Sequence, residues 1–215
     1  MRAVLMVLAI AVIAAGCGGG DDDSGGATTA ANGECETVEQ PAPREPGTNE
    51  APSGSLDPSK THTLTFDTSC GSFTITLDPT LAPETTASLV ALANAGYFDD
   101  TVFHRVVPGF VIQGGDPTQT GAGGPGYSTV DVPPSGSAYS RGVVAMAKAG
   151  VEAPGTAGSQ FFVVSGDDAG LPPEYAIVGE VTDGMDTVER IDALGVGDGP
   201  PSQPVVVNSV TVAES

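Results

Sequence analysis

The chain has 215 residues, of which 27 are acidic and 7 basic, so its formal net charge is −20. This acidity makes nucleic acid and anionic lipid headgroups unfavourable electrostatic partners, and we expect no nucleic-acid binding. With two histidines, His62 and His104, and no G-x-S-x-G motif, the sequence offers neither a zinc ligand set nor a Ser-His hydrolase. We therefore expect no metal and no cofactor.

Residues 1–16 have the pattern of a bacterial signal peptide. Met1 and Arg2 precede an apolar run, Ala3 to Ala15, that is shorter than the roughly 20 residues a membrane-spanning helix needs. Residues 14–17, Ala-Ala-Gly-Cys, resemble a lipobox, which predicts cleavage before Cys17 and a lipid on its thiol. The chain would then be exported and anchored to the extracytoplasmic side of the cell membrane. An ordinary secretory signal with an incidental Cys17 is the alternative.

Residues 17–60 predict a flexible acidic tether, because they are rich in Gly, Pro and Asp and carry almost no bulky apolar side chains. Residues 61–215 would form the single folded domain, with enough apolar residues for one core. In an oxidising compartment Cys35 and Cys70 would pair as a disulfide, while two free thiols remain the alternative. Such a bridge would hold the end of the tether against the first strands.

Hydrophobic periodicity from residue 61 onward predicts a mainly β domain. Period-two alternation on both sides of Cys70 and Gly71 indicates an antiparallel hairpin. A helix is expected over Ala82 to Asn94, with Pro83 in its first turn, and a second helix over Met185 to Leu194. Further strands are expected at residues 102–107, 110–113, 142–147, 161–164, 176–181 and 205–212. Many strands and two separated helices suggest a closed antiparallel barrel capped at its ends.

Two motifs carry the functional signal. Residues Phe103 to Asp116 read FHRVVPGFVIQGGD, and Gly158 to Phe162 read GSQFF. In this order and at this interval they resemble the active-site signature of the cyclophilins, which are peptidyl-prolyl cis-trans isomerases. The resemblance covers about residues 61–212, and it implies an eight-stranded closed antiparallel barrel with an α-helix over each opening.

The chemistry of such an isomerase requires no nucleophile. Rotation about an X-Pro bond is slow because amide resonance sets a barrier of about 20 kcal/mol. A hydrogen-bond donor near the prolyl nitrogen, together with an apolar pocket for the ring, would lower that barrier. The resemblance implies that Arg105 is this donor and that Gln113 steadies it or binds substrate backbone. It implies that substrate binds to Phe110, Val111, Ala147, Lys148, Gln160, Phe162, Leu171 and Tyr175.

Several positions differ from many cyclophilins. Gly170 stands where a Trp is frequent, Tyr175 where a His is usual, Val111 where a Met lines the pocket and Lys148 where an Asn is usual. The primary hypothesis is a monomeric, lipid-anchored isomerase that accelerates folding of exported proteins by binding proline-containing, unfolded or extended polypeptides. The alternatives are a non-catalytic proline-peptide binding module on the same barrel, and a purely structural surface lipoprotein.

Overall fold

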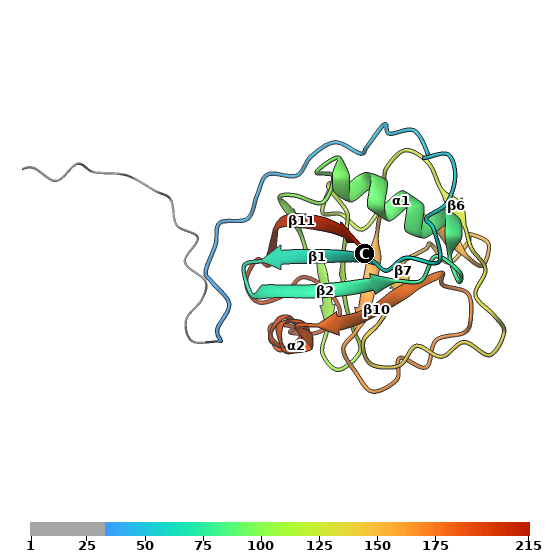
Figure 1. Cartoon of the computed structure of the whole chain (residues 1–215). Helices are drawn as coiled ribbons and strands as arrows, with labels where there is room; N and C mark the ends of the chain where they lie inside the picture. Colours follow the sequence, from blue (N-terminus) through green and yellow to red (C-terminus); the bar gives the residue numbers. More distant parts are fainter. Residues whose placement is uncertain (1–32) are drawn as a thin grey trace, which may run out of the picture.

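The computed structural model describes residues 33–215, so the expected signal peptide and Cys17 lie outside the described residues. Within residues 33–215, two helices and eleven strands follow one another (Figure 1). The helices are α1 (Pro83–Asn94) and α2 (Met185–Asp192). The strands are β1 (His62–Thr68), β2 (Gly71–Leu77), β3 (Thr101–Val102), β4 (Arg105–Val107), β5 (Val111–Gly114), β6 (Thr129–Val130), β7 (Val143–Met146), β8 (Thr156–Ala157), β9 (Phe161–Val164), β10 (Ile177–Asp183) and β11 (Val206–Glu214).

The domain is mainly β, as the sequence predicts, and its main sheet is antiparallel. Nine strands pair in the order β3-β11-β1-β2-β10-β7-β9-β5-β4, and β6 pairs with β8 separately. The expected hairpin is present, with Phe66 opposite Phe73 and Leu64 opposite Ile75 on neighbouring strands. These four side chains point into the core because every second residue of a strand faces the same side.

The expectation of a closed barrel with eight strands is wrong. The sheet curls round the core, but its order has two ends, β3 and β4, which no ladder joins. A single strand was expected over residues 102–107. Phe103 and His104 belong to no strand, so this segment forms two short strands, β3 and β4, instead. Beyond their sheet partners they make only isolated bridges, Val102 with Asp116 and Val106 with Gly199. The sheet is therefore an open half-barrel.

Both faces of the central strands carry apolar side chains. In β9, Phe161 and Val163 enter the main core, whereas Phe162 and Val164 lie in a second, smaller cluster on the opposite face. A strand with apolar residues on both faces reads as an uninterrupted apolar run, which explains the sequence FFVV. The second cluster is the platform on which the candidate site is built.

The two helices match the expected segments and cover the main core. Helix α1 begins with Pro83, whose missing N–H costs nothing in the first turn, and it buries Leu89 and Leu92. Helix α2 buries Val188 and Ile191 against the core. No helix within residues 33–215 is both long enough and apolar enough to span a bilayer.

Residues 34–60 differ from the expected flexible tether. The structure lays them against the domain, with Cys35 Sγ bonded to Cys70 Sγ at 2.05 Å and the Glu36 N–H donating to the Ser69 carbonyl over 2.7 Å. Apolar burial does not hold this segment, because most of its side chains are exposed. Main-chain hydrogen bonds and the disulfide expected from the two cysteines hold it instead, and composition gives no signal for the hydrogen bonds.

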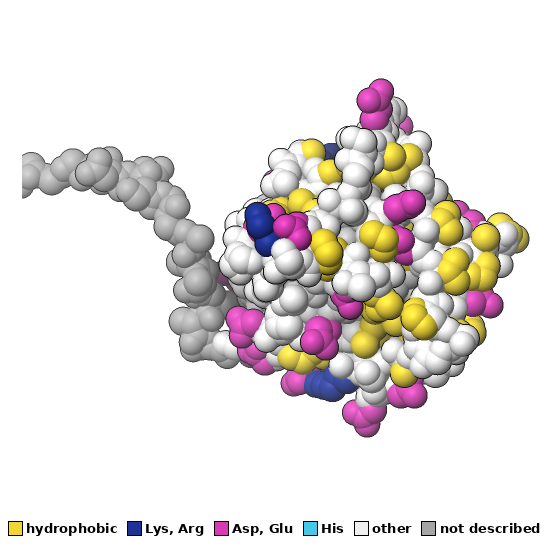
Figure 2. Space-filling view, turned by 45° about the vertical axis from the view of Figure 1, so that its right-hand side comes forward, with side chains coloured by type: hydrophobic (Ala, Val, Ile, Leu, Met, Phe, Trp, Pro, Cys, Tyr) yellow, Lys and Arg dark blue, Asp and Glu magenta, His cyan; other side chains and the backbone are white. Residues whose placement is uncertain are grey.

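The surface agrees with the acidic composition. Figure 2 shows acidic side chains distributed over the viewed face, with few Lys or Arg among them. No basic patch is visible on that face. A net charge of this size favours solvation of a folded domain.

Candidate active site

The candidate site is a row of side chains that crosses four neighbouring strands. Arg105 on β4 pairs directly with Gln113 on β5, which pairs with Phe162 on β9. Phe162 in turn lies opposite Ala145 on β7. Because directly opposed residues point to the same face of a sheet, the register alone brings the cation, the amide and the aromatic ring together.

The guanidinium of Arg105 is held on two sides. Its Nη1 donates to Gln113 Oε1 at 3.2 Å, and its Nε and Nη2 donate to the two carboxylate oxygens of Asp198 at 2.6 and 3.1 Å. This bidentate pair fixes the plane of the guanidinium. Its hydrogen bond to Arg105 lowers the pKa of Asp198 below the ordinary value of 3.8. The carboxylate therefore stays ionised at neutral pH.

Asp198 reaches Arg105 from a distant part of the chain. It lies in the loop between α2 and β11, where the Val106 N–H donates to the Gly199 carbonyl over 2.8 Å. That bond ties the loop to the residue next to Arg105, so the carboxylate is placed by main-chain geometry. Sequence reasoning missed Asp198 because a single acid in a Gly-Pro loop, 93 residues away, forms no motif.

A chain of amides continues from Arg105 along the groove. Gln113 Nε2 donates to Gln160 Oε1 at 3.0 Å, and Gln160 Nε2 donates to the Gly123 carbonyl at 2.9 Å. Each amide is thus oriented by the next, with its oxygen accepting and its nitrogen donating. The chain ends on the main chain of the glycine-rich loop, so the position of Arg105 depends on that loop as well.

An apolar pocket of about 230 Å³ opens beside the guanidinium. It holds nine of the ten residues that the sequence predicts for catalysis and substrate binding. These are Arg105, Phe110, Val111, Gln113, Ala147, Lys148, Phe162, Leu171 and Tyr175. The tenth, Gln160, lines an adjoining cleft and reaches the pocket through Gln113. A small recess with an apolar floor and a few polar groups at its rim is the usual form of a ligand site.

Tyr139 supports the floor of this pocket and was missed by sequence reasoning. Its ring is fully buried, with its centroid 6.3 Å from that of Phe162 and 6.0 Å from that of Tyr175. Its hydroxyl donates to the Tyr175 carbonyl at 2.8 Å and accepts from the Tyr175 N–H at 3.0 Å. Burial raises the pKa of Tyr139 above 10.0, which keeps the hydroxyl protonated and able to donate. Tyr175 is therefore fixed through both its ring and its backbone.

The side chain of Lys148 is not available to a ligand in this arrangement. It is 3% exposed, and its Nζ lies 3.3 Å from Glu174 Oε2 and 5.3 Å from the centroid of the Tyr175 ring. The ion pair and the ring together hold the ammonium against the rim. Lys148 consequently separates the apolar pocket from the adjoining cleft and lines both.

Comparison with known proteins decides the family. The family model described as "Cyclophilin type peptidyl-prolyl cis-trans isomerase/CLD" matches residues 63–212. The chain belongs to the cyclophilins. It is 40% identical over 171 residues to the "Probable peptidyl-prolyl cis-trans isomerase A" of Mycobacterium leprae, covering 70% of this chain and 92% of that protein. It is 41% identical over 175 residues to "Peptidyl-prolyl cis-trans isomerase A" of Mycobacterium tuberculosis, covering 73% and 94%.

Solved structures agree with this assignment. A cyclophilin-type isomerase of Cryptosporidium parvum, crystallised in the presence of the dipeptide Ala-Pro, has a TM-score of 0.65 and 31% identity to this chain. The match covers 70% of this chain and 98% of that one. By family and relatives this cyclophilin is a peptidyl-prolyl cis-trans isomerase, so the primary functional hypothesis is confirmed for the enzyme class.

Two further groups of this cyclophilin adjoin the site. Asp116 is fully buried; burial alone would raise its pKa, but hydrogen bonds from Thr118, Gly121 and Gly123 outweigh it and lower the pKa. The carboxylate thereby organises the glycine-rich loop. His104, next to Arg105, has a pKa below 6.5 because burial disfavours its charged form. Neither of its ring nitrogens has a hydrogen-bond partner among the described residues.

Proposed function

We propose that Arg105 lowers the rotation barrier by donating an N–H toward the prolyl nitrogen of a substrate seated in the apolar pocket. The barrier, about 18–20 kcal/mol, comes from conjugation of the prolyl nitrogen with the preceding carbonyl. A donor aimed at that nitrogen stabilises the twisted state, in which its lone pair is localised, more than the planar state. No proton needs to be transferred, and no covalent intermediate is formed.

The free hydrogens of the guanidinium support this role. A guanidinium has five N–H donors, of which two contact Asp198 and one contacts Gln113. One hydrogen therefore remains on each terminal nitrogen, Nη1 and Nη2. Arg105 lines the pocket together with Phe162 and Leu171, so its guanidinium has donors left for a ligand in that recess. This juxtaposition of a fixed cation and an apolar recess is the observation that carries the proposal.

We infer that the substrates are proline-containing, unfolded or extended polypeptides. The relative from Cryptosporidium parvum was crystallised with Ala-Pro, a minimal peptide of this class. A pocket of about 230 Å³ suits a compact ring. Tyr175 and Gln113, which line the pocket, offer donors and acceptors to the peptide groups on either side of the proline.

We further propose that the enzyme acts as a monomer on exported proteins, from a lipid anchor at Cys17. The apolar run of residues 3–15 and the lipobox-like residues 14–17 support the export and the anchor. Proline isomerisation takes tens of seconds and can limit folding, so an isomerase is useful where chains emerge unfolded. Mass spectrometry of the native protein tests the anchor. A diacylated N-terminal Cys17 is expected, and an unmodified Cys17 would refute it.

The catalytic proposal is tested by measuring cis-trans exchange of an Ala-Pro peptide with NMR. Arg105→Ala should lower kcat/KM by about 10²-fold, the usual loss when one preorganised donor is removed. Arg141→Ala is the matched control, since Arg141 pairs with Glu189 and with the Ser165 carbonyl away from the pocket. Equal activity of the Arg105 variant and wild type would refute the role of Arg105. Loss of exchange with retained peptide binding would separate catalysis from binding.

A further inference from the structure

Residues 35–59, here called the strap, run round the outside of the domain and precede the part that matches the cyclophilin family, residues 63–212 (Figure 1). Its first residue is covalently attached, because Cys35 forms the disulfide with Cys70. Near its other end the Asp57 carbonyl lies 2.9 Å from His62 Nε2 at the start of β1. The strap is thus attached to the domain at both ends.

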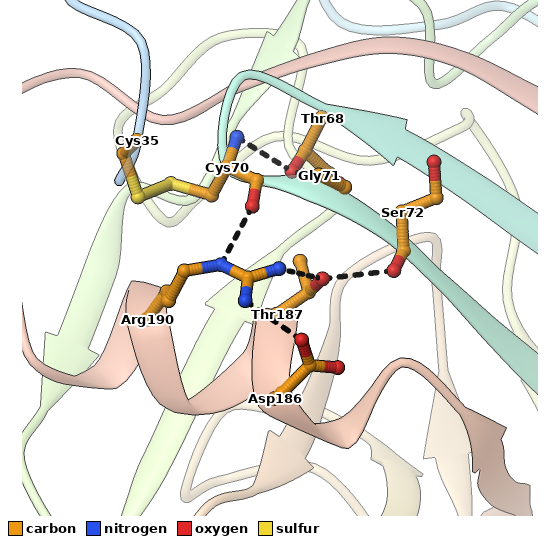
Figure 3. Close-up of polar contacts among 8 residues, drawn as sticks. All are labelled: Cys35, Thr68, Cys70, Gly71, Ser72, Asp186, Thr187 and Arg190. Carbon is orange, nitrogen blue, oxygen red and sulfur yellow. Dashed lines mark hydrogen bonds and ion pairs between the residues drawn. A yellow bond between two sulfur atoms is a disulfide. The ribbon is translucent and has the colours of Figure 1, made fainter. Parts of the chain in front are cut away.

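The disulfide end is held firmly by α2, as Figure 3 shows. Arg190 Nε donates to the Cys70 carbonyl at 3.0 Å, while its other nitrogens donate to Asp186 and to the Thr187 hydroxyl, both at 2.7 Å. The Thr187 hydroxyl donates to the Ser72 carbonyl at 2.9 Å. One guanidinium therefore connects the turn that carries Cys70 to two side chains of the helix. The strap begins at a rigid point of the fold.

The middle of the strap is hydrogen-bonded to the loop that follows β5. The Arg44 N–H donates to the Pro117 carbonyl, the Gly47 N–H to the Gly124 carbonyl and the Asn49 N–H to the Pro125 carbonyl, each over 2.8 Å. This loop is the one that Asp116 organises from the inside. Its outer side is therefore fixed by the strap and its inner side by a buried carboxylate.

A cleft of about 610 Å³ lies where the strap meets this loop. It shares Gln113, Ala147 and Lys148 with the apolar pocket, so the two hollows adjoin one another. Pro46 and Gly47 of the strap form part of the cleft wall. Much of the remaining wall is the glycine-rich main chain of residues 121–126 and the amide of Gln160. Main-chain and amide groups recognise an extended backbone rather than one particular side chain.

We propose that the strap is part of the substrate groove: Pro46 and Gly47 contact the polypeptide beside the proline and set the preference of the enzyme for extended chains over short peptides. This inference rests on the proposed substrate groove. The pocket that would hold the ring has a volume of about 230 Å³, whereas the adjoining cleft, of about 610 Å³, has room for residues beside the proline. Extended chain advances about 3.3 Å per residue, so several flanking residues can lie along such a cleft.

Gly47 offers the sharpest perturbation. A Cβ at this position would lie 3.0 Å from both the Cα and the carbonyl oxygen of Pro125, and 2.6 Å from Asn49 Nδ2. The amide of Asn49 can rotate away, but the backbone of Pro125 cannot, so Gly47→Val would push the strap off the loop. Gly136 is the matched control, because a Cβ there meets nothing within 4 Å.

The test compares two substrates, acetyl-Ala-Pro-amide and a twelve-residue polar peptide with one central Ala-Pro, by NMR exchange on the full chain. For Gly47→Val the ratio of kcat/KM for the long peptide to that for the short one should fall about fivefold, as expected for the loss of one or two flanking contacts. Gly136→Val should leave this ratio at the wild-type value. A ratio unchanged in Gly47→Val, or an equal fall for both peptides, would overturn the inference.

A second measurement avoids any folding defect of the variant. Titration of the wild-type protein with the long peptide should shift the amide signals of Gly47 and Asn49, whereas the short peptide should leave them in place. Unshifted signals at saturation with the long peptide would also overturn the inference. This titration reports binding alone, so it separates the two proposals. Wild-type protein that exchanges neither peptide would refute the isomerase mechanism, while the strap signals would still show whether bound peptide reaches them.

Discussion

Asp198 should act as a positioning residue for Arg105, and its removal is the most informative single perturbation of the site. Of the three hydrogen bonds that fix the guanidinium, Asp198 accepts two and Gln113 accepts one. Asp198→Ala leaves only the bond to Gln113, so the guanidinium can rotate out of plane. Misplacement of a catalytic group by 1 Å can lower the rate about 10²-fold. Because the hydrogen bond to Gln113 remains, we expect kcat/KM of this variant to fall by less, about tenfold. Asp198→Asn keeps an acceptor and should lose less.

The control for Asp198 is another exposed ion pair of the same kind. Asp186 pairs with Arg190 on α2. The two carboxylates are similarly exposed, 71% for Asp186 and 67% for Asp198, and so are their partners, 26% for Arg190 and 31% for Arg105. Exposed pairs of this kind add little to stability, so both alanine variants should melt within a few degrees of wild type. Only Asp198→Ala should slow Ala-Pro exchange. Wild-type kcat/KM in that variant, or an equal loss in Asp186→Ala, would refute the positioning role.

The pH dependence of activity gives an independent test of the same pair. The pKa of Asp198 is lowered in the folded state by its hydrogen bond to Arg105. A carboxylate with a depressed pKa keeps its contact at all pH values above its ordinary 3.8 and loses it as pH falls through the folded value. The kcat/KM for Ala-Pro exchange, measured by NMR, should therefore be constant from about pH 5 upward and should decline only below about pH 4. A decline centred near neutral pH would point to another group.

Three changes outside the catalytic pair have defined consequences. Tyr139→Phe should lower the free energy of unfolding in urea by about 1–3 kcal/mol, because the N–H and carbonyl of Tyr175 lose their partner; an unchanged midpoint would contradict this. Burial lowers the pKa of His104 below 6.5, so the free energy of unfolding should fall as the pH drops from 6.5 toward that lowered pKa. In urea titrations at several pH values, His104→Asn should remove this decrease. The double variant Cys35→Ser, Cys70→Ser should lose about 4 kcal/mol of the free energy of unfolding, because the disulfide closes a loop with a sequence separation of 35. A urea midpoint equal to that of wild type would argue against a stabilising bridge.

Much of the fold followed from periodicity. The hairpin of β1 and β2, both helices and the apolar strand β9 were expected at nearly their observed bounds, because each has a strong local pattern. The two-residue strands β6 and β8 were missed, since so short a segment has no period. Closure of the sheet was wrongly expected because it depends on whether distant edges meet, which no local pattern encodes.

The candidate site divides in the same way. Arg105, Gln113 and Phe162 lie in recognisable motifs, and strand register then forces them into one row. Asp198 and Tyr139 lie in segments without a motif, and only the folded chain brings them to the site. The composition of residues 17–60, which include the strap, predicts a tether because it resembles that of unfolded sequence. Its order comes from individual hydrogen bonds to another loop, which composition does not report.

The pairing of β1 with β11 ties activity to completion of the chain. The strand nearest the start of the domain, His62–Thr68, has Val206–Glu214 as one of its two partners, so this ladder cannot form until those later residues have been synthesised. Asp198, which orients the guanidinium, is also among the last parts to emerge. A growing polypeptide that still lacks this region has neither this ladder nor the two contacts of Asp198 with Arg105. The guanidinium is therefore fully oriented only after Asp198 has been synthesised.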